Sequence, residues 1–243
     1  MSNTDSVRIT QNDILFEDNH IIAVNKKAGW IVQPDKTGDD SMEEGVKLFL
    51  KNKYNKPGNV FLGVAHRIDR PVSGIVLFAK TSKALTRLNN MFQSREIQKT
   101  YLVVSRGRPD PVSGKLVHYL LRDQQKNKAT AHKTEVPGSS KSELDYFTEA
   151  VSDSFALIRV LPRTGRHHQI RVQMASLGCP ITGDVKYGDR RANEDRSICL
   201  HAFALQFKHP VSGEDVWIGA PLPKHKFWQI FKDKANELAK QFA

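Results

Sequence analysis

The order of the apolar segments limits the fold of this chain more than any other feature of its sequence. Short β-rich runs follow one another in clusters, and only a few segments between them have the spacing of an amphipathic helix. In a doubly wound fold strands alternate strictly with helices, so this order predicts an α+β domain with a mixed or antiparallel sheet. The expected strands are Ile14–Glu17, Ile21–Asn25, Ile75–Ala79, Tyr101–Val104, Leu116–Leu121, Leu144–Ala150, Phe155–Leu161, Ile198–Phe207 and Val216–Gly219.

The helices are predicted from capping patterns and from apolar spacing. A capping box opens the first helix, and a serine at a suitable position can cap the second. Gly178 is a natural C-terminal stop for the third. The expected starts and ranges are Ser41–Glu44 for the first, Ser82 for the second, Gly165–Leu177 for the third and Lys224–Phe242 for the last.

One basic stretch is predicted to be a loop. Residues Arg122–Lys141 hold five Lys or Arg against two Asp or Glu. Such a segment either contacts phosphates or is a solvated insertion, and the sequence favours neither.

The charge of the chain favours a polyanionic partner. Its 243 residues carry a formal net charge of +11, and 39% are hydrophobic, which is enough for a folded core. Such a surface attracts nucleic acid first and anionic membranes second. There is no run of about 18 apolar residues and no apolar signal-peptide core in Met1–Asp13, so we expect a cytoplasmic protein that does not enter a membrane. Cys179 and Cys199 are expected to be buried free thiols.

The most informative segment is residues 63–80. It places Asp69 among His66, Arg67 and Arg70 and then enters an apolar strand. A polar loop fixed to a rigid strand is a favoured place for catalysis. The flanking guanidinium groups favour a charged carboxylate, which is then available as a nucleophile or as an electrostatic anchor. The same pattern also fits a plain Arg–Asp ion pair that holds a turn.

A second polar segment, residues 163–173, combines arginines with two histidines. On a helix, Arg171 lies about 100° from Ile170, at the margin of the apolar stripe, where it could reach a half-buried anion. His167 and His168 are adjacent and therefore diverge on a helix, and no Cys or carboxylate follows at ligand spacing, so no metal site is expected. Contact with RNA and a satisfied structural role both remain open for these histidines.

Tyr101, at the start of an expected strand, is a further candidate. Its ring offers a flat face for stacking on a base, and its hydroxyl can form a hydrogen bond. A tyrosine buried in the core is the alternative interpretation.

These three segments together resemble the RluA-like family of RNA pseudouridine synthases. The family's core motif is His-Arg-Leu-Asp, a short spacer, Ser-Gly and an apolar strand. It stands here as residues 66–74, with Ile68 in place of Leu and Val72 where Thr is frequent. The second change removes a hydroxyl but leaves the carboxylate in place.

Two further segments extend the resemblance. Residues 14–29 resemble the family's entry hairpin, with Lys26-Lys27 where the family usually has Lys-Pro, and residues 164–171 match its later arginine motif. The resemblance runs from Ile14 to Pro223, and several motifs in the right order make it specific. We therefore expect residues 1–13 to be a tail and residues 14–243 to form a single pseudouridine synthase catalytic domain.

The resemblance implies a fold and a reaction. The fold is an α+β domain with a long, mostly antiparallel sheet, flanking helices and a central cleft. The reaction cleaves the bond between N1 of uracil and C1′, turns the base and rejoins it through C5, with neither a metal nor an organic cofactor. Asp69 is the implied nucleophile, with attack at C1′ or at C6 both open. Tyr101 is implied to stack on the base and to be a candidate proton acceptor, and Arg171 to pair with Asp69.

The resemblance also implies how RNA is bound. The target base must leave its stack, and Arg67 is implied to fill the vacated space or to hold a phosphate. Further RNA contacts are expected at His66, Arg70, Arg166 and His168. Compact members of the family have no accessory N-terminal domain, and only about a dozen residues precede Ile14. We therefore expect a monomer that selects a tRNA or rRNA stem-loop through its catalytic domain.

Two other functions remain open at this point. A non-catalytic RNA-binding protein on the same fold would form no pseudouridine and would be indifferent to the change Asp69→Asn. A hydrolase that uses Asp69 as a general base, such as a nucleoside glycosidase, would release free uracil.

Overall fold

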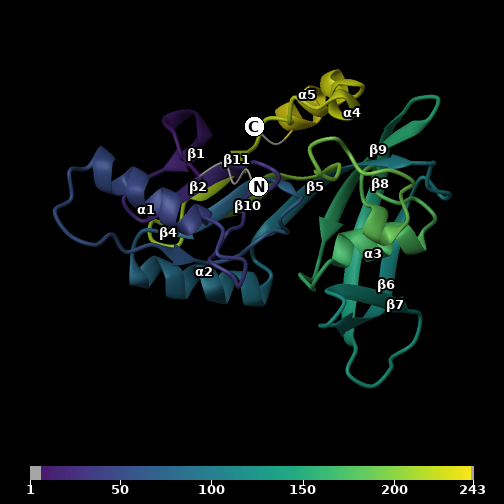
Figure 1. Ribbon diagram of the computed structural model, residues 1–243, viewed down its shortest axis with the longest axis horizontal. Helices are drawn as coiled ribbons and strands as arrows, with labels where there is room; N and C mark the ends of the chain where they lie inside the picture. Colours follow the sequence, from purple (N-terminus) through teal and green to yellow (C-terminus); the bar gives the residue numbers. More distant parts are fainter. Residues whose placement is uncertain (1–6, 242–243) are drawn as a thin grey trace. The chain divides into compact units, whose positions relative to one another are not determined.

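The computed structural model describes residues 7–241, which pack as two compact units (Figure 1). The first unit holds the chain up to Gln98 together with Ala204–Pro221, and the second holds Lys99–Phe203 and the chain from Leu222 onward. Strand β10 (Leu200–Lys208) begins in the second unit and ends in the first. Among the described residues, no helix is long and apolar enough to cross a bilayer.

The entry hairpin forms because an aspartate closes its turn. After a short helical turn, η1 (Gln11–Asp13), strands β1 (Ile14–Glu17) and β2 (Ile21–Lys26) pair antiparallel. Oδ1 of Asp18 accepts hydrogen bonds from the backbone N–H groups of His20 and Ile21, each at 2.7 Å. An aspartate that bonds the backbone just after it favours a turn, so the predicted hairpin is confirmed.

The sheet of the first unit is covered on both faces. Its strand order is β1-β2-β4-β10, with β3 (Gly63–Val64) paired to β4 (Ser73–Ala79) and β11 (Asp215–Gly219) paired to β10. Every residue of β4 is buried. A strand buried on both faces reads as a continuous apolar run rather than as an alternation, which is the pattern of the sequence here.

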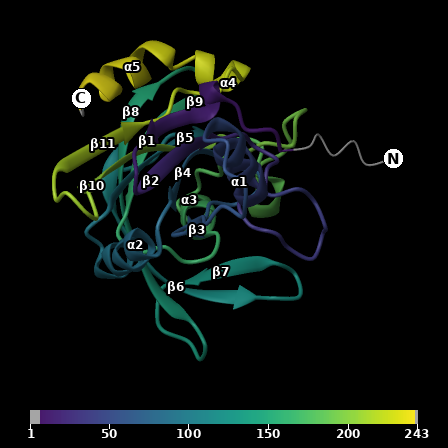
Figure 2. The same cartoon turned by 90° about the vertical axis from the view of Figure 1, so that its left-hand side faces the viewer.

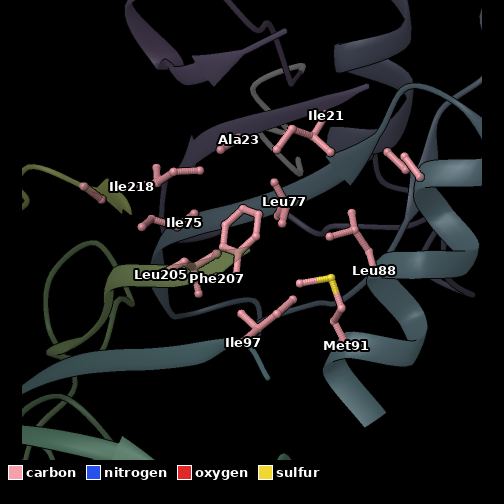
Figure 3. Close-up of a cluster of buried hydrophobic side chains, with 13 residues drawn as sticks. Ile21, Ala23, Ile75, Leu77, Leu88, Met91, Ile97, Leu205, Phe207 and Ile218 are labelled. Carbon is pink, nitrogen blue, oxygen red and sulfur yellow. The ribbon is translucent and has the colours of Figure 1, made fainter. Parts of the chain in front are cut away.

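Each face of β2 and β4 packs on its own helix. Ile75 and Leu77 point to a cluster that includes residues of α2 (Ser82–Ser94), as Figure 3 shows, whereas Val76 and Phe78 point to a cluster that includes residues of α1 (Met42–Lys53). Successive side chains of a strand point to opposite faces, so one apolar run supplies both cores. The loop that carries Asp69 therefore leads into a strand clamped between two hydrophobic layers.

Helix α1 has the predicted capping box, and helix α2 begins one residue earlier than expected. Oγ of Ser41 accepts from the N–H of Glu44, and the Glu44 carboxylate accepts from the N–H of Ser41. In α2 the capping side chain is that of Thr81, which accepts from the N–H of Ala84, so the assignment of the cap to Ser82 was wrong. Both side chains are hydroxyls, and the sequence offered no means to choose between them.

Part of the segment expected to be a polar tail packs on α1. Val7 and Ile9 are buried in the same cluster as the inner face of that helix. A Cβ added at Gly45 would lie 2.5 Å from the carbonyl oxygen of Val7 and 3.2 Å from a side-chain carbon of Ile9. The glycine inside α1 thus allows the incoming chain to approach the helix backbone.

We expect Gly45→Ala to lower the free energy of unfolding by about 1 kcal/mol, because the new methyl group must displace a backbone carbonyl. In an open helix the same change adds up to about 1 kcal/mol of stability. Urea unfolding measures the difference, with Gly58→Ala as the control, since a Cβ at Gly58 meets nothing within 4 Å. A Gly45→Ala protein more stable than the native one would contradict this packing.

The second unit is an antiparallel sheet with one helix beside its far strands. Its order is β10-β5-β9-β8-β6-β7, and each neighbouring pair from β5 to β7 runs antiparallel. Helix α3 packs against β6 and β7 through Val172, which shares a buried cluster with Leu120 and Ala129. The elements of this unit are β5 (Gln98–Arg106), β6 (Ser113–Asp123), β7 (Lys128–His132), β8 (Ser140–Val151), β9 (Phe155–Pro162), α3 (Gln169–Ser176), η2 (Val185–Tyr187), α4 (Lys226–Gln229) and α5 (Lys232–Gln241).

The α+β class with a mostly antiparallel sheet is confirmed, but three sequence predictions were wrong in detail. The expected loop at residues 122–141 contains strand β7, which pairs with β6 to form an arm (Figure 2). Helix α3 starts at Gln169 rather than Gly165, because His168 has a left-handed backbone with φ 53°. The last helix is divided into α4 and α5, and Phe242 lies outside the described residues.

Candidate active site

The Asp69 loop joins a short strand to the most buried strand of the first unit. It connects β3 to β4, and the N–H of Val72 donates to the carbonyl of Asp69 at 3.0 Å, which closes a tight turn. Asp69 itself is half-buried, and Arg67 and Arg70 are exposed. The carboxylate thus sits at the first position of a turn whose far end continues into a strand held on both faces.

A buried lysine binds the backbone carbonyls of this turn. Lys26, at the end of β2, has no solvent-exposed surface. Its ammonium group donates to three backbone carbonyls, those of Lys27 at 3.1 Å, Arg70 at 3.0 Å and Val72 at 2.7 Å. In its protonated form the side chain has three donors, so all of them are used and three carbonyls are satisfied. Two of these carbonyls belong to the Asp69 turn.

The environment of Lys26 changes its titration. Burial lowers its pKa from 10.5 to about 7, the negative charge of Asp69 raises it in part, and the positive charge of Arg70 lowers it again. From the sequence, Lys26 was identified only as part of the entry hairpin, and this role was missed. The available signal was a lysine directly after an apolar strand, a position where a charged side chain must find partners.

Arg70 is tied at both its backbone and its side chain. Its carbonyl also accepts from the N–H of Gly29 at 2.8 Å, and its guanidinium donates to the carboxylate of Asp39 at 2.6 Å. Gly29 has φ 92°, a conformation that favours glycine. These bonds fix the turn further, and the contact of Arg70 with RNA stays a prediction.

His66 anchors the start of the same loop. Its Nε2 accepts a hydrogen bond from the backbone N–H of Leu77 in β4 at 2.9 Å, and its ring packs on Phe92 with 4.7 Å between ring centroids. Because a backbone N–H can only donate, Nε2 of His66 carries no proton. This environment favours a structural role for His66, and its contact with RNA stays a prediction.

In the second unit, Arg171 forms a buried two-point ion pair with Asp184. Nε of Arg171 lies 2.7 Å from Oδ2 of Asp184, and Nη2 lies 2.8 Å from Oδ1. The guanidinium carbon also lies 5.1 Å from the centre of the Tyr187 ring. Neither Asp184 nor Tyr187 was a candidate site residue from the sequence. The expected ion pair between Arg171 and Asp69 stays a prediction.

His168 belongs to the same network. The Tyr187 hydroxyl accepts from the N–H of Ala129 at 2.7 Å and lies 2.8 Å from Nδ1 of His168, to which it can therefore donate. Burial lowers the pKa of His168 to about 2, and the positive charge of Arg171 adds to this effect. His168 is thus neutral at physiological pH, which favours the structural alternative.

The loop before α3 is held by one glutamine. Oε1 of Gln169 accepts from Oγ1 of Thr164 at 2.7 Å and from the N–H of Arg166 at 3.0 Å, and Nε2 donates to the carbonyl of Glu143. The Arg166 side chain is exposed. An exposed arginine on a fixed loop is able to meet a phosphate, so this expected contact is sterically open.

Tyr101 lies in β5, opposite Val160 of β9. Its side chain is half-buried, so the core-tyrosine alternative, which requires full burial, is not favoured. Base stacking by Tyr101 stays a prediction.

We expect Lys26→Met to lower the rate of catalysis at saturating substrate by about tenfold, because a turn that loses its supporting donors no longer aims the carboxylate. Lys27→Met is the matched control, since the Lys27 side chain is 63% exposed and its ammonium lies 3.4 Å from Asp13. Equal losses in the two variants would contradict the positioning role.

The pH dependence of stability provides a second readout for Lys26. Its pKa is about 7 in the folded protein and near 10.5 when unfolded, so between these values the unfolded chain binds more protons. The free energy of unfolding of the native protein should therefore rise with pH across this window, relative to that of Lys26→Met. Parallel pH profiles for the two proteins would contradict the assignment.

The comparisons with known proteins converge on one family. A family model described as RNA pseudouridylate synthase matches residues 20–176. That range contains Lys26, Asp69, Tyr101 and Arg171, whereas Asp184 and Tyr187 lie beyond its end.

Curated relatives match over most of the chain. Ribosomal large subunit pseudouridine synthase C of Pasteurella multocida is 34% identical over 218 residues, covering 87% of this chain and 65% of the relative. The protein of the same name from Buchnera aphidicola is 33% identical, covering 87% and 67%. tRNA pseudouridine synthase C of Yersinia pestis is 30% identical, covering 86% and 85%. The chain thus spans about two thirds of the length of the two large-subunit relatives.

Solved structures share the fold. Human RNA Pseudouridylate Synthase Domain Containing 4 superposes with a TM-score of 0.74 at 20% identity, covering 94% of this chain and 93% of that one. Human RNA Pseudouridylate Synthase Domain Containing 1 gives 0.70 at 22% identity, covering 95% and 94%.

Proposed function

The chain belongs to the family of RNA pseudouridylate synthases, and on that premise we propose that it converts a specific uridine of RNA to pseudouridine, with Asp69 as the nucleophile. One observation carries the role of Asp69. The turn that presents its carboxylate is bound through two of its carbonyls by the buried ammonium of Lys26. A nucleophile needs a fixed direction of attack, and a support of this kind supplies it.

The proposed reaction rearranges one glycosidic bond. The bond between N1 and C1′ breaks, the uracil turns, and a bond between C5 and C1′ forms. C5 loses its proton and N1 gains one, so no atom or electron is exchanged with a cofactor. The carboxylate of Asp69 forms a transient bond to C1′ or to C6 and is released at the end.

Other residues are proposed to prepare the substrate. Extruding a uridine from its stack costs a few kcal/mol, and Arg67, exposed on the Asp69 loop, is proposed to fill the vacated space or hold the phosphate. Tyr101 is proposed to stack on the extruded base. Arg171 is proposed to pair with Asp69, in addition to its bond with Asp184, and so to aim the carboxylate.

The substrate is proposed to be structured ribosomal or transfer RNA. The relatives are named as pseudouridine synthases of the ribosomal large subunit and of tRNA. The net charge of +11 suits phosphate binding, and the arm of β6 and β7 adds Arg122, Lys126 and Lys128. We propose that the protein acts in the cytoplasm as a monomer on a uridine in a loop or stem-loop.

Release of tritium tests this proposal. Bulk tRNA and ribosomal RNA that carry tritium at C5 of uridine are incubated separately with the protein. Loss of the C5 proton to water then counts isomerisation events, and chromatography of digested RNA identifies pseudouridine. Free uracil in place of pseudouridine would indicate the hydrolase. RNA binding without release from either substrate would indicate a non-catalytic binding protein.

A further inference from the structure

A pocket in the second unit is lined by none of the residues assigned above. Its volume is about 450 Å³, and four segments surround it: the end of β5, the turn between β8 and β9, the chain after α3 and the chain after η2. Arg106 lines it, five residues after Tyr101 in the same strand. Residues an odd number apart in a strand point to opposite faces, so the pocket faces away from the side of the sheet to which Tyr101 points.

The guanidinium of Arg106 is held in one orientation. Its Nε donates to Oδ1 of Asp189 at 2.9 Å, and its carbon lies 5.1 Å from the centre of the Phe155 ring. The side chain keeps 38% of its surface exposed. Within residues 7–241 no acceptor is recorded for its two terminal nitrogens. Because Nε is bound by Asp189 and the flat face of the guanidinium packs on Phe155, the two terminal nitrogens are presented side by side. This geometry suits an anion that offers two oxygens.

Asp189 fixes the orientation of the Arg106 guanidinium, and its carboxylate is not exposed in the pocket, where it would repel an anion. Its side chain is 1% exposed. Besides Arg106, its oxygens accept from the N–H of Gly183 at 2.6 Å and from the N–H of Arg190 at 2.8 Å. The buried carboxylate is thus satisfied by three donors from the protein. The exposed Arg190 adds a second cation to the pocket lining.

Glycines leave the backbone around this pocket open. Gly107, Gly178 and Gly188 line it, with φ values of 82°, 78° and 105°. A Cβ added at Gly178 or Gly188 would meet nothing within 4 Å. These positions therefore allow a ligand to approach the main chain, which side chains would prevent.

We propose that this pocket binds a backbone phosphate of RNA, with Arg106 holding two phosphate oxygens and Arg190 supplying the second charge. The proposal rests on the proposed function in that RNA is the polyanion. The ligand is a phosphodiester, because two arginines around an open pocket read charge and shape rather than base identity. The contact extends the bound RNA beyond the extruded uridine.

Salt titration of RNA binding tests the pocket without requiring turnover. Bulk tRNA is the probe, and filter binding gives the dissociation constant of each protein from 50 to 200 mM salt. We plot the logarithm of the association constant against the logarithm of the salt concentration. Because each phosphate contact contributes about one to the steepness of this line, we expect Arg190→Gln to reduce the steepness by about one. Arg191→Gln is the control. It removes the same charge at the next exposed residue, which does not line the pocket, and should leave the slope unchanged.

A second variant adds charge instead of removing it. Ser154 is exposed in the turn between β8 and β9 and lines the pocket, so Ser154→Glu places a carboxylate there without touching Asp189. We expect it to weaken tRNA binding about tenfold at 50 mM salt, since a like charge opposes the phosphate.

Equal slopes for Arg190→Gln and Arg191→Gln, or native affinity in Ser154→Glu, would overturn the proposal. If native protein forms pseudouridine while these variants bind like native protein, the pocket assignment fails and the enzyme assignment stands. If native protein binds tRNA through Arg190 but forms no pseudouridine in either RNA class, the pocket assignment stands alone.

Discussion

Changing Asp69 to asparagine is expected to abolish pseudouridine formation, by about 10⁴-fold or more. An amide of the same shape keeps the turn but does not attack carbon, and loss of a covalent nucleophile is among the most severe changes that an enzyme can suffer. Binding of RNA should be retained, because the change removes one negative charge from a surface that meets a polyanion. Single-turnover tritium release, with filter binding on the same samples, measures both quantities.

Asp39→Asn is the matched control for this change. The change at Asp39 is chemically the same, since it replaces one carboxylate oxygen by an amide nitrogen. The Asp39 carboxylate, however, binds the guanidinium of Arg70, which belongs to the Asp69 loop. We expect less than a tenfold loss of activity, since the Arg70 carbonyl remains bound by Lys26 and Gly29. Activity above a tenth of native in Asp69→Asn, or a comparable loss in both variants, would show that the nucleophile lies elsewhere.

Asp184→Asn is expected to lower the free energy of unfolding by about 3 kcal/mol or more. Both partners of the Arg171–Asp184 pair are buried, with 6% and 1% of their side chains exposed. Removing one charge from such a pair leaves the other buried without compensation, which costs about 3–5 kcal/mol. Urea unfolding followed by fluorescence and by circular dichroism measures this cost and shows whether the transition stays two-state.

Asp145→Asn makes the same chemical change in an open environment. Asp145 binds Arg163 at 2.7 Å, but that arginine is 57% exposed. We expect the change in the free energy of unfolding to stay below about 1 kcal/mol, as for exposed pairs in general. Similar values for Asp184→Asn and Asp145→Asn would mean that burial does not govern the energetics of the Arg171 network.

The sequence predicted the parts of the fold that depend on neighbouring residues. The Asp18 turn, the capping box of Ser41 and Glu44, and the buried run of β4 were all identified because each signal lies within a few positions. The α+β class followed from their order. The Asp69 loop was selected as a candidate site for the same reason, since its histidine and arginines are adjacent.

Features that depend on distant residues could not be predicted. The ammonium of Lys26 binds carbonyls 44 and 46 positions further along the chain, and Arg171 finds Asp184 13 positions on. No periodicity or propensity encodes such pairs. Strand β7 was missed because three of the five residues of Lys128–His132 are one Lys and two Ala, types that strands disfavour, and only its pairing with β6 makes it a strand.

The start of α3 shows a different limit. The sequence prediction began the helix at Gly165, but Thr164 and Arg166 bond to the Gln169 side chain instead of continuing a helical ladder. Side chains that bond the nearby backbone compete with helix formation, and here that competition decides where the helix begins. The outcome depends on Glu143 in another strand, which the local sequence does not contain.

Because Lys26 is buried, the rate at which its amine is chemically labelled reports how often the Asp69 turn opens. Acylating reagents attack neutral amines, and this amine is reached only when the Asp69 turn opens locally. Opening returns the amine to water, where its pKa reverts from about 7 toward 10.5. Above pH 7 the amine is neutral in the closed state, and the open form that reacts is also neutral. Reaching the reactive form then releases no proton, so the labelling rate becomes independent of pH. An ordinary surface lysine would instead react tenfold faster with each pH unit up to about 10.4. The pH at which labelling of Lys26 levels off therefore measures the buried pKa, and the height of the plateau gives the free energy of opening the turn with the amine kept neutral.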